Sequence, residues 1–267
     1  MSNVTQRLIK GSAWLSASRA IINLLNALNT IVLAWYLVPA DFGLVAIGTT
    51  LITILNSVTE LSLNQALIRH ENLTHEHFSV VWTMGVLRGL ALGGLFAVGA
   101  YPVSVYYGDP RLLNVMLVLS LSLLLSGLGN PRSVMMQRQL IFWQEFVLTV
   151  TQKLVGFLVT LLIAVVYKSY WALVLGMLSY QITNVVLSYS ILPFVPKPTF
   201  KHLRELFGFS VWLSLGQIVN TLNWRFEYLV LGKLLGPTPL GHYTVGNTLS
   251  TLPTREATAP LTATIYP

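Results

Sequence analysis

Hydrophobic positions along the chain are grouped into long apolar runs, which short polar segments separate. A membrane-spanning helix needs ~20 mostly apolar residues, and the runs reach or approach that length. Strands with ten-residue alternation, as in a membrane barrel, are absent from the pattern. The pattern therefore predicts an all-α polytopic membrane protein with about eight transmembrane helices. They are expected at roughly 11–37, 42–68, 79–105, 112–129, 146–167, 171–193, 208–235 and 240–265.

Composition supports this prediction. Of the 267 residues, 54% are hydrophobic and 9% are charged, whereas a soluble domain carries about 25% charged residues. The mean hydropathy is +0.67. The chain contains no Cys, which excludes disulfides, thiolate metal sites and cysteine nucleophiles. These values exclude a soluble enzyme, a disordered tail and a fibrous repeat.

The basic residues indicate how the helices are oriented. With a cytoplasmic N-terminus, eight Lys and Arg residues lie in segments on the inside, and three lie outside: Arg111, Lys168 and Lys233. Lys and Arg are enriched in cytoplasmic loops, so we expect a multi-pass inner-membrane protein with its N-terminus in the cytoplasm. The net charge of +7 then reflects topology and contacts with anionic lipid. Nothing in the sequence supports binding to nucleic acid.

The chain contains an internal repeat with an offset of 198 residues. Residues 14–51 align without a gap to 212–249, and twelve of the 38 positions are identical. The identities include Trp14/Trp212, Pro39/Pro237 and Gly43/Gly241. Six predicted spans separate the copies, so both copies enter the membrane in the same direction. This is the parallel type of repeat found in secondary transporters.

The repeat defines the expected domains. Residues 1–196 form a six-helix transmembrane lobe, and residues 197–267 begin a second, incomplete lobe. The segment between them, Lys197–Leu206, has the apolar spacing of a short interfacial helix, although a solvated linker explains it nearly as well. Two equal lobes would need roughly 400 residues or more, so we expect a truncated product or fragment.

Polar residues at three- and four-residue spacing follow the first, second and seventh predicted helices. Such residues are costly inside a membrane, and they usually face a bundle interior or an aqueous cavity. The alternatives are snorkelling for Arg19, a structural ion pair for Glu60 and interhelical hydrogen bonding for the amides. The candidate cavity-lining, substrate-binding residues are Arg19, Asn23, Asn26, Asn56, Glu60, Arg88, Lys153, Gln217 and Arg225.

The charged residues of the candidate set are mainly basic, with Glu60 as the one acid. Arg matches phosphate oxygens with a planar fork, so the set suits an anionic headgroup such as a lipid-linked pyrophosphate, and the amides suit sugar hydroxyls. We find no Walker loop and expect no cofactor or metal. His70, His75 and His77 lie near Glu71 and Glu76, but a solvated polar loop explains this cluster better than a metal site.

Several motifs resemble the bacterial polysaccharide-transport family of oligosaccharide flippases, of the O-antigen or colanic-acid type. The family lies within the multidrug, oligosaccharidyl-lipid and polysaccharide exporter superfamily. The resemblance spans the chain and rests on diffuse helix patterns. The matching segments are 11–14 with Arg19, 36–47, 60–69, 130–138 with Phe142, and 207–214.

The resemblance implies two six-helix bundles around a central cavity. It also implies movement of an undecaprenyl-pyrophosphate-linked oligosaccharide to the outer leaflet by alternating access, with Arg19 and Arg88 receiving the headgroup. The implied partners are the lipid bilayer, the lipid-linked oligosaccharide and other polysaccharide assembly proteins. By this comparison we expect most of a second lobe to be missing, so a non-functional fragment is one alternative.

Two other functions compete with this hypothesis. A cation-coupled small-molecule exporter of the multidrug type would have the same fold, but we expect its cavity to be acidic or aromatic. A membrane-embedded enzyme needs positioned titratable groups for acid–base chemistry. The predicted outer connections are only a few residues long, so we expect a transporter rather than an enzyme.

Overall fold

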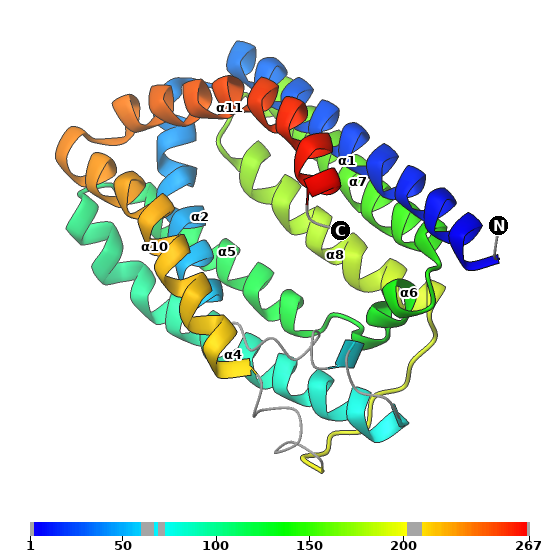
Figure 1. The fold of residues 1–267 in the computed structure, drawn as a ribbon. Helices are drawn as coiled ribbons and strands as arrows, with labels where there is room; N and C mark the ends of the chain where they lie inside the picture. The colour runs from blue at the N-terminus through cyan, green and yellow to red at the C-terminus, as the bar shows by residue number, and fades with distance from the viewer. Residues whose placement is uncertain (1–2, 60–66, 69–72, 202–209, 266–267) are drawn as a thin grey trace.

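A computed structural model describes residues 3–59, 67–68, 73–201 and 210–265, and within these ranges it contains helices and no strands (Figure 1). The all-α prediction is confirmed. The elements are α1 (Asn3–Tyr36), α2 (Pro39–Thr59), α4 (His75–Tyr107), α5 (Arg111–Gly127), the 3₁₀ turn η1 (Pro131–Ser133), α6 (Val134–Arg138), α7 (Phe142–Tyr167), α8 (Trp171–Ile191), α10 (Ser210–Leu235) and α11 (Pro237–Ile265).

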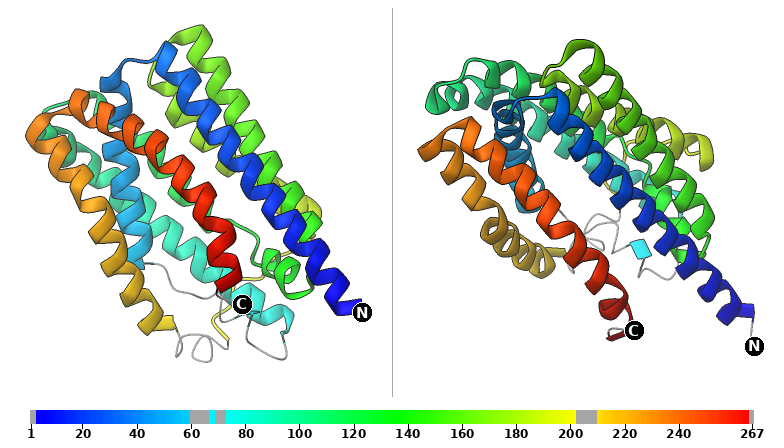
Figure 2. Two further views of the ribbon diagram at one scale, coloured as in Figure 1. Left: turned by 45° about the horizontal axis from the view of Figure 1, so that its top comes forward. Right: turned by 90° about the horizontal axis from the view of Figure 1, so that it is seen from above.

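Short connections bring four helix–helix turns to one end of the molecule, which we call the turn end. It contains residues 37–38, 108–110, 168–170 and 236 (Figure 1). Gly108 closes α4 with a φ of 72° and Gly236 follows α10 with a φ of 83°, a conformation that glycine adopts without steric cost. The opposite end, which we call the loop end, contains the bend after α5, residues 192–200 and both ends of the described chain (Figure 2).

The bend after α5 organises the loop end. The helices on either side of residues 128–130 meet at 59°. The Asn130 side chain accepts from the backbone N–H of Arg132 at 3.0 Å, and its Nδ2 donates to the carbonyls of Ser188 and Leu192 at 3.0 and 2.7 Å. These bonds join the bend to the C-terminal end of α8. Residues 192–200 continue without regular structure, and the N–H of Thr199 reaches the Thr83 hydroxyl on α4 at 3.2 Å.

The main core lies in the turn half of the molecule. Its buried side chains come from α2, α4, α5, α8, α10 and α11, and the fully buried ones include Leu44, Val115, Val174 and Leu240. Helix α1 packs along α7, where the rings of Trp14 and Phe146 lie 4.8 Å apart. In a membrane, van der Waals packing of this kind drives helix association.

Glycines allow α4 and α5 to pack backbone to backbone. A Cβ on Gly89 would meet the carbonyl of Leu123 at 3.0 Å and the α-carbon of Gly127 at 3.1 Å. Glycines also allow α2 and α11 to cross in close backbone contact. A Cβ on Gly43 would collide with the backbone of Pro237, and a Cβ on Gly241 would collide with that of Pro39. The two crossing contacts join equivalent positions of the internal repeat.

The helices differ in their suitability for crossing a membrane. In the described part of the chain, five helices are long and apolar enough: Ala13–Tyr36, Pro39–Thr59, His75–Tyr107, Phe142–Tyr167 and Trp171–Ile191. The bent pair Arg111–Gly127 and Pro131–Arg138 makes a sixth if it is one span. Helices α10 and α11 coincide with the last two predicted spans but do not meet this criterion over their described residues.

Candidate functional site

Two cavities lie among the helices that precede α10. The first, here called the loop-end cavity, has a volume of about 280 Å³ and lies between α4, α5, the bend, α7 and α8. The second, here called the mid-bundle cavity, has a volume of about 370 Å³ and is lined by α1, α2, α5, α7 and α8. Ser126 on α5 lines both of them. The two cavities are therefore neighbours.

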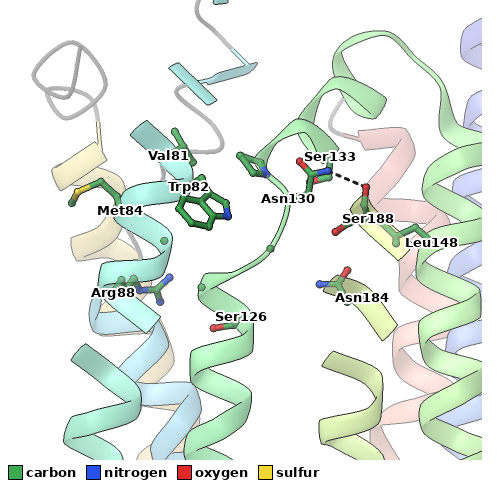
Figure 3. A pocket seen from close by; sticks show the side chains of 14 residues that line it. Val81, Trp82, Met84, Arg88, Ser126, Asn130, Ser133, Leu148, Asn184 and Ser188 are labelled. Atoms are coloured by element: carbon green, nitrogen blue, oxygen red, sulfur yellow. Dashed lines mark hydrogen bonds between the residues drawn. The ribbon is translucent and has the colours of Figure 1, made fainter. Parts of the chain in front are cut away.

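The loop-end cavity has a largely polar lining (Figure 3). Arg88 and Trp82 on α4 lie on one side, and Asn184 and Ser188 on α8 lie on the other. Asn130 closes the side formed by the bend, where its Nδ2 donates to the Ser188 carbonyl. The cavity thus combines one guanidinium group with amides and hydroxyls from separate helices.

Arg88 is held in place by α2. Its Nε donates to the Thr59 hydroxyl at 3.0 Å, and its Nη2 donates to both the main-chain and side-chain oxygens of Asn56, at 2.9 and 3.0 Å. Because the guanidinium group is planar and rigid, these bonds from Nε and Nη2 fix the orientation of the whole group. A cation held in this way can present a preorganised positive charge to a ligand in the loop-end cavity.

The mid-bundle cavity is lined by one charged side chain among the described residues, that of Lys153 on α7. The other polar groups come from several helices: the amides of Asn29, Asn56 and Gln181, the hydroxyls of Ser122, Ser126 and Thr160, and the phenol of Tyr180. Apolar side chains such as Phe157 and Met177 complete the wall. This mixture of an apolar wall and a few convergent polar groups is typical of ligand sites.

Two glycines set the distance between the helices at this cavity. A Cβ on Gly156 of α7 would meet the carbonyl of Gly176 on α8 at 3.1 Å, and a Cβ on Gly176 would collide with the Thr160 side chain. Close approach through small residues is a general feature of membrane helix packing. It brings Lys153, one turn from Gly156, into the same cavity as Tyr180 and Gln181, one turn from Gly176.

The turn end is closed by contacts between α4 and α10. Lys233 donates from Nζ to the Tyr106 carbonyl, and the ammonium lies 4.1 Å from the centroid of the Tyr106 ring. The Tyr107 hydroxyl donates to the Leu229 carbonyl at 3.2 Å. Together with the crossing of α2 and α11, these contacts join α10 and α11 to the preceding helices in the turn half.

The structure brings together three of the residues selected from the sequence. Asn56 contacts Arg88 directly, and Asn56 and Lys153 line the same cavity. Each comes from a different helix, so this proximity depends on packing. Whether these residues bind substrate stays a prediction.

The other selected residues lie elsewhere or outside the described part of the chain. On α1, Arg19 is exposed and Asn23 and Asn26 are half-buried, apart from the residues described as lining the two cavities. Arg225 lies 5.7 Å from the centroid of the Tyr228 ring, a cation–π distance. Glu60 and the side chain of Gln217 fall outside the described residues.

Several lining residues were missed by the sequence reasoning. Asn29 follows Asn26 by three positions, and Gln181, Asn184 and Ser188 follow one another at three- and four-residue steps on α8. Residues at this spacing share one helix face. The three residues on α8 give it a polar face like those of the first, second and seventh predicted helices. The sequence shows that this face exists, but it does not show which other polar faces it packs against.

Comparisons with known proteins identify related sequences. Residues 32–267 match the family described as "Polysaccharide biosynthesis protein". The chain is 24% identical to an uncharacterized membrane protein in the cps region of Klebsiella pneumoniae, over 97% of this chain and 54% of the relative. It is 23% identical to the lipopolysaccharide biosynthesis protein WzxC of Escherichia coli strain K12, over 99% and 55%.

A third relative is the teichuronic acid biosynthesis protein TuaB of Bacillus subtilis strain 168, which is 20% identical over 100% of this chain and 56% of the relative. The chain thus spans about half the length of the curated relatives it matches. No solved structure matches the chain.

Proposed function

The chain belongs to the polysaccharide biosynthesis family of membrane transport proteins, and from this premise we propose that it acts in moving a polyprenyl-pyrophosphate-linked oligosaccharide across the inner membrane. The direction is from the cytoplasmic to the periplasmic leaflet. The observation that carries the proposal is the pair of adjacent cavities, one lined by Arg88 and one by Lys153. Because the chain spans about half of its relatives, the activity is assigned to the whole transporter of which these helices form a part.

Arg88 is proposed to contact the pyrophosphate. An arginine forms charge-assisted, often bidentate hydrogen bonds with phosphate oxygens. Arg88 lines the loop-end cavity, and its hydrogen bonds to Asn56 and Thr59 on α2 hold the guanidinium group in place. Asn184, Ser126 and Ser133 add hydrogen-bonding groups along the same cavity. A pyrophosphate entering from the loop end would meet these groups first.

Alternating access is proposed as the mechanism. It requires a substrate path that is closed at one membrane face while it is open at the other. The described contacts of α10 and α11 with the earlier helices involve residues 228–245 in the turn half, including Lys233 with Tyr106 and Gly241 with Pro39. We assign the turn end to the periplasm, since the loop end carries the excess of basic residues. The structure then corresponds to a state closed toward the periplasm.

Helices α10 and α11 are proposed to cross the membrane as the beginning of a second lobe, with the boundary at residues 196 and 197. Both helices pack against α2, and α11 crosses it at the turn end before running toward the C-terminus (Figures 1 and 2). Their equivalence to α1 and α2 in the repeat supports a pseudo-two-fold arrangement. Exposed apolar residues on α10, such as Val219, Trp224 and Phe226, suit contact with lipid or with further helices.

The charge of the cavities bears on the alternative functions. Arg88 and Lys153 would repel a cationic drug, so the lining supports an anionic substrate over the cargo of a multidrug-type exporter. Two of the relatives are named as proteins of lipopolysaccharide biosynthesis and of teichuronic acid biosynthesis, which also supports the proposed substrate class. On the same grounds we propose a transporter and not an enzyme.

The proposal can be tested in a bacterial strain that lacks its own oligosaccharide flippase, so that lipid-linked repeat units accumulate in the inner leaflet. Expression of the full-length gene product that contains these helices should lower this accumulation. The Arg88→Ala variant at the same membrane level should not lower it, and Arg88→Lys should act weakly because a lysine keeps the charge but lacks the fork. Unchanged accumulation with the wild-type protein present in the membrane would contradict the proposed function.

A further inference from the structure

The mid-bundle cavity has a feature that a pyrophosphate site does not explain. Its one charged lining side chain among the described residues is Lys153, which is half-buried. No hydrogen bond or ion pair joins its ammonium to another described side chain, although amide oxygens line the same cavity. We propose that this cavity binds a single acidic sugar residue of the oligosaccharide, with the sugar carboxylate paired to Lys153. The inference rests on the proposed function and names its substrate class.

The first argument is charge. An ammonium at membrane depth is costly unless a counter-charge accompanies it, and the described residues around the cavity provide no carboxylate. A ligand with one negative charge would neutralise Lys153. Lysine is a compact point charge with no preferred fork geometry. A single lysine without a second cation in the described lining suits a ligand with one negative charge, such as a sugar carboxylate, better than a pyrophosphate, which carries more than one.

The second argument is the remaining polar lining. Asn29, Asn56 and Gln181 project from α1, α2 and α8, and each amide has both donors and an acceptor. Tyr180 and Thr160 contribute hydroxyls from α8 and α7. Groups that both donate and accept, arranged around a cavity from several directions, match the hydroxyls of a sugar ring. A fatty-acid carboxylate would leave most of these groups without partners, which carries a desolvation cost.

The third argument is size. The volume of about 370 Å³ corresponds to about twelve water molecules at ~30 Å³ each. This is room for one pyranose ring with its substituents and not for a whole repeat unit. Phe157 and Met177 give the cavity an apolar wall on which the carbon face of such a ring can pack. The shared lining residue Ser126 places this subsite next to the loop-end cavity.

The test uses the whole chain in lipid nanodiscs, with methyl glucuronide as the acidic probe and methyl glucoside as the neutral probe. Saturation-transfer difference NMR detects binding even at millimolar affinity. The wild-type protein should bind the glucuronide about tenfold or more tightly than the glucoside, because a charge-assisted hydrogen bond contributes ~1.5–3 kcal/mol. Equal affinity for the two probes would overturn the inference.

Three variants test whether Lys153 causes the preference for the glucuronide over the glucoside. Lys153→Met should bind both glycosides equally, and Lys153→Arg should keep the preference for the glucuronide. Lys168→Met removes the same charge from the residue that follows α7 at the turn end and should behave as wild type. Retention of the preference in Lys153→Met, or its loss in Lys168→Met, would contradict the proposal. Competition by inorganic pyrophosphate that depends on Lys153 would assign the lysine to the pyrophosphate instead.

The outcome is separable from that of the flippase test. If the protein lowers accumulation of lipid-linked repeat units in the deletion strain but shows no preference for the glucuronide, the proposed function stands and the acidic-sugar subsite is wrong. If the preference depends on Lys153 but accumulation does not change, the cavity binds an acidic sugar and the flippase function is wrong.

Discussion

Arg88 and Asn56 form a direct contact between α4 and α2, with Nη2 of the arginine 3.0 Å from Oδ1 and 2.9 Å from the main-chain oxygen of Asn56. Arg88 lines the loop-end cavity, and Asn56 lines the mid-bundle cavity. One residue pair therefore belongs to both candidate subsites. It also fixes the relative position of two helices whose other contacts are few.

Replacing Arg88 should affect stability as well as transport. Arg88→Ala leaves the half-buried Asn56 and Thr59 oxygens without this donor, and a hydrogen bond to a charged group contributes up to ~3 kcal/mol. We expect a lower midpoint of thermal unfolding in detergent, followed by tryptophan fluorescence, with a smaller decrease for Arg88→Lys. An unchanged midpoint for Arg88→Ala would mean that the contact does not stabilise the α2–α4 pair.

The Asn56→Asp variant should separate stability from substrate binding. The new carboxylate would form a charge-assisted bond with Arg88, which is roughly twice as strong as a neutral one, so we expect a higher unfolding midpoint. The same carboxylate places a negative charge beside both cavities and should weaken the binding of anionic probes. Thermal unfolding and titration with inorganic pyrophosphate measure the two effects. Tighter pyrophosphate binding in this variant would contradict the assignment of Arg88.

The crossing of α2 and α11 should be intolerant of any side chain. Gly43→Ala places a methyl group on the Pro237 backbone, and Gly241→Ala places one on the Pro39 backbone. Overpacking typically costs ~1–3 kcal/mol, and here the obstacle is main chain that has little freedom to move. We expect both variants to unfold at lower temperature and to lose transport.

Gly94→Ala is the matched control for the crossing variants, because a Cβ at this helical glycine meets no atom within 4 Å. Replacing an exposed helical glycine by alanine stabilises a helix by ~1 kcal/mol. The control should therefore unfold at the same or a higher temperature than wild type. Similar destabilisation by Gly94→Ala and Gly43→Ala would show that the crossing is not the cause.

Asp109 at the turn end should make a small pH-dependent contribution to stability. The Arg111 side chain donates to its carboxylate at 2.7 Å, and this hydrogen bond lowers the pKa of Asp109 below its usual value of 3.8. A lowered pKa means that the stabilisation is complete above the unfolded-state pKa and is lost as the pH falls through the folded-state pKa. Because Arg111 is 44% exposed, the contribution should be ~0.2–1 kcal/mol.

The measurement compares thermal unfolding of wild type and Asp109→Asn. At pH 7 the variant should have the lower midpoint, and the difference should disappear once the pH falls below the range in which Asp109 is ionised. A difference that persists at acidic pH would show that the loss comes from packing or neutral hydrogen bonding and not from the carboxylate charge.

The sequence by itself determined the helical fold and much of its organisation. Long apolar runs predict helices because lipid offers the backbone no hydrogen-bonding partners, and the helices occur where the runs predict them. The repeat predicted that Pro39 and Gly43 correspond to Pro237 and Gly241. The sequence identified Lys153, Arg88 and Asn56 as candidates because polar groups inside apolar runs are costly in a membrane and usually face a bundle interior or a cavity.

Only the tertiary structure decided which polar faces meet. Helical periodicity fixes the face on which a residue lies, but the partner of that face depends on backbone contacts far apart in sequence, such as Gly156 with Gly176. This packing placed Asn29 and Gln181 in the same cavity as Lys153 and left Arg19 exposed. The pairing of Arg88 with Asn56 joins residues 32 positions apart, a relation set by the packing of α2 against α4 and invisible in either helix alone.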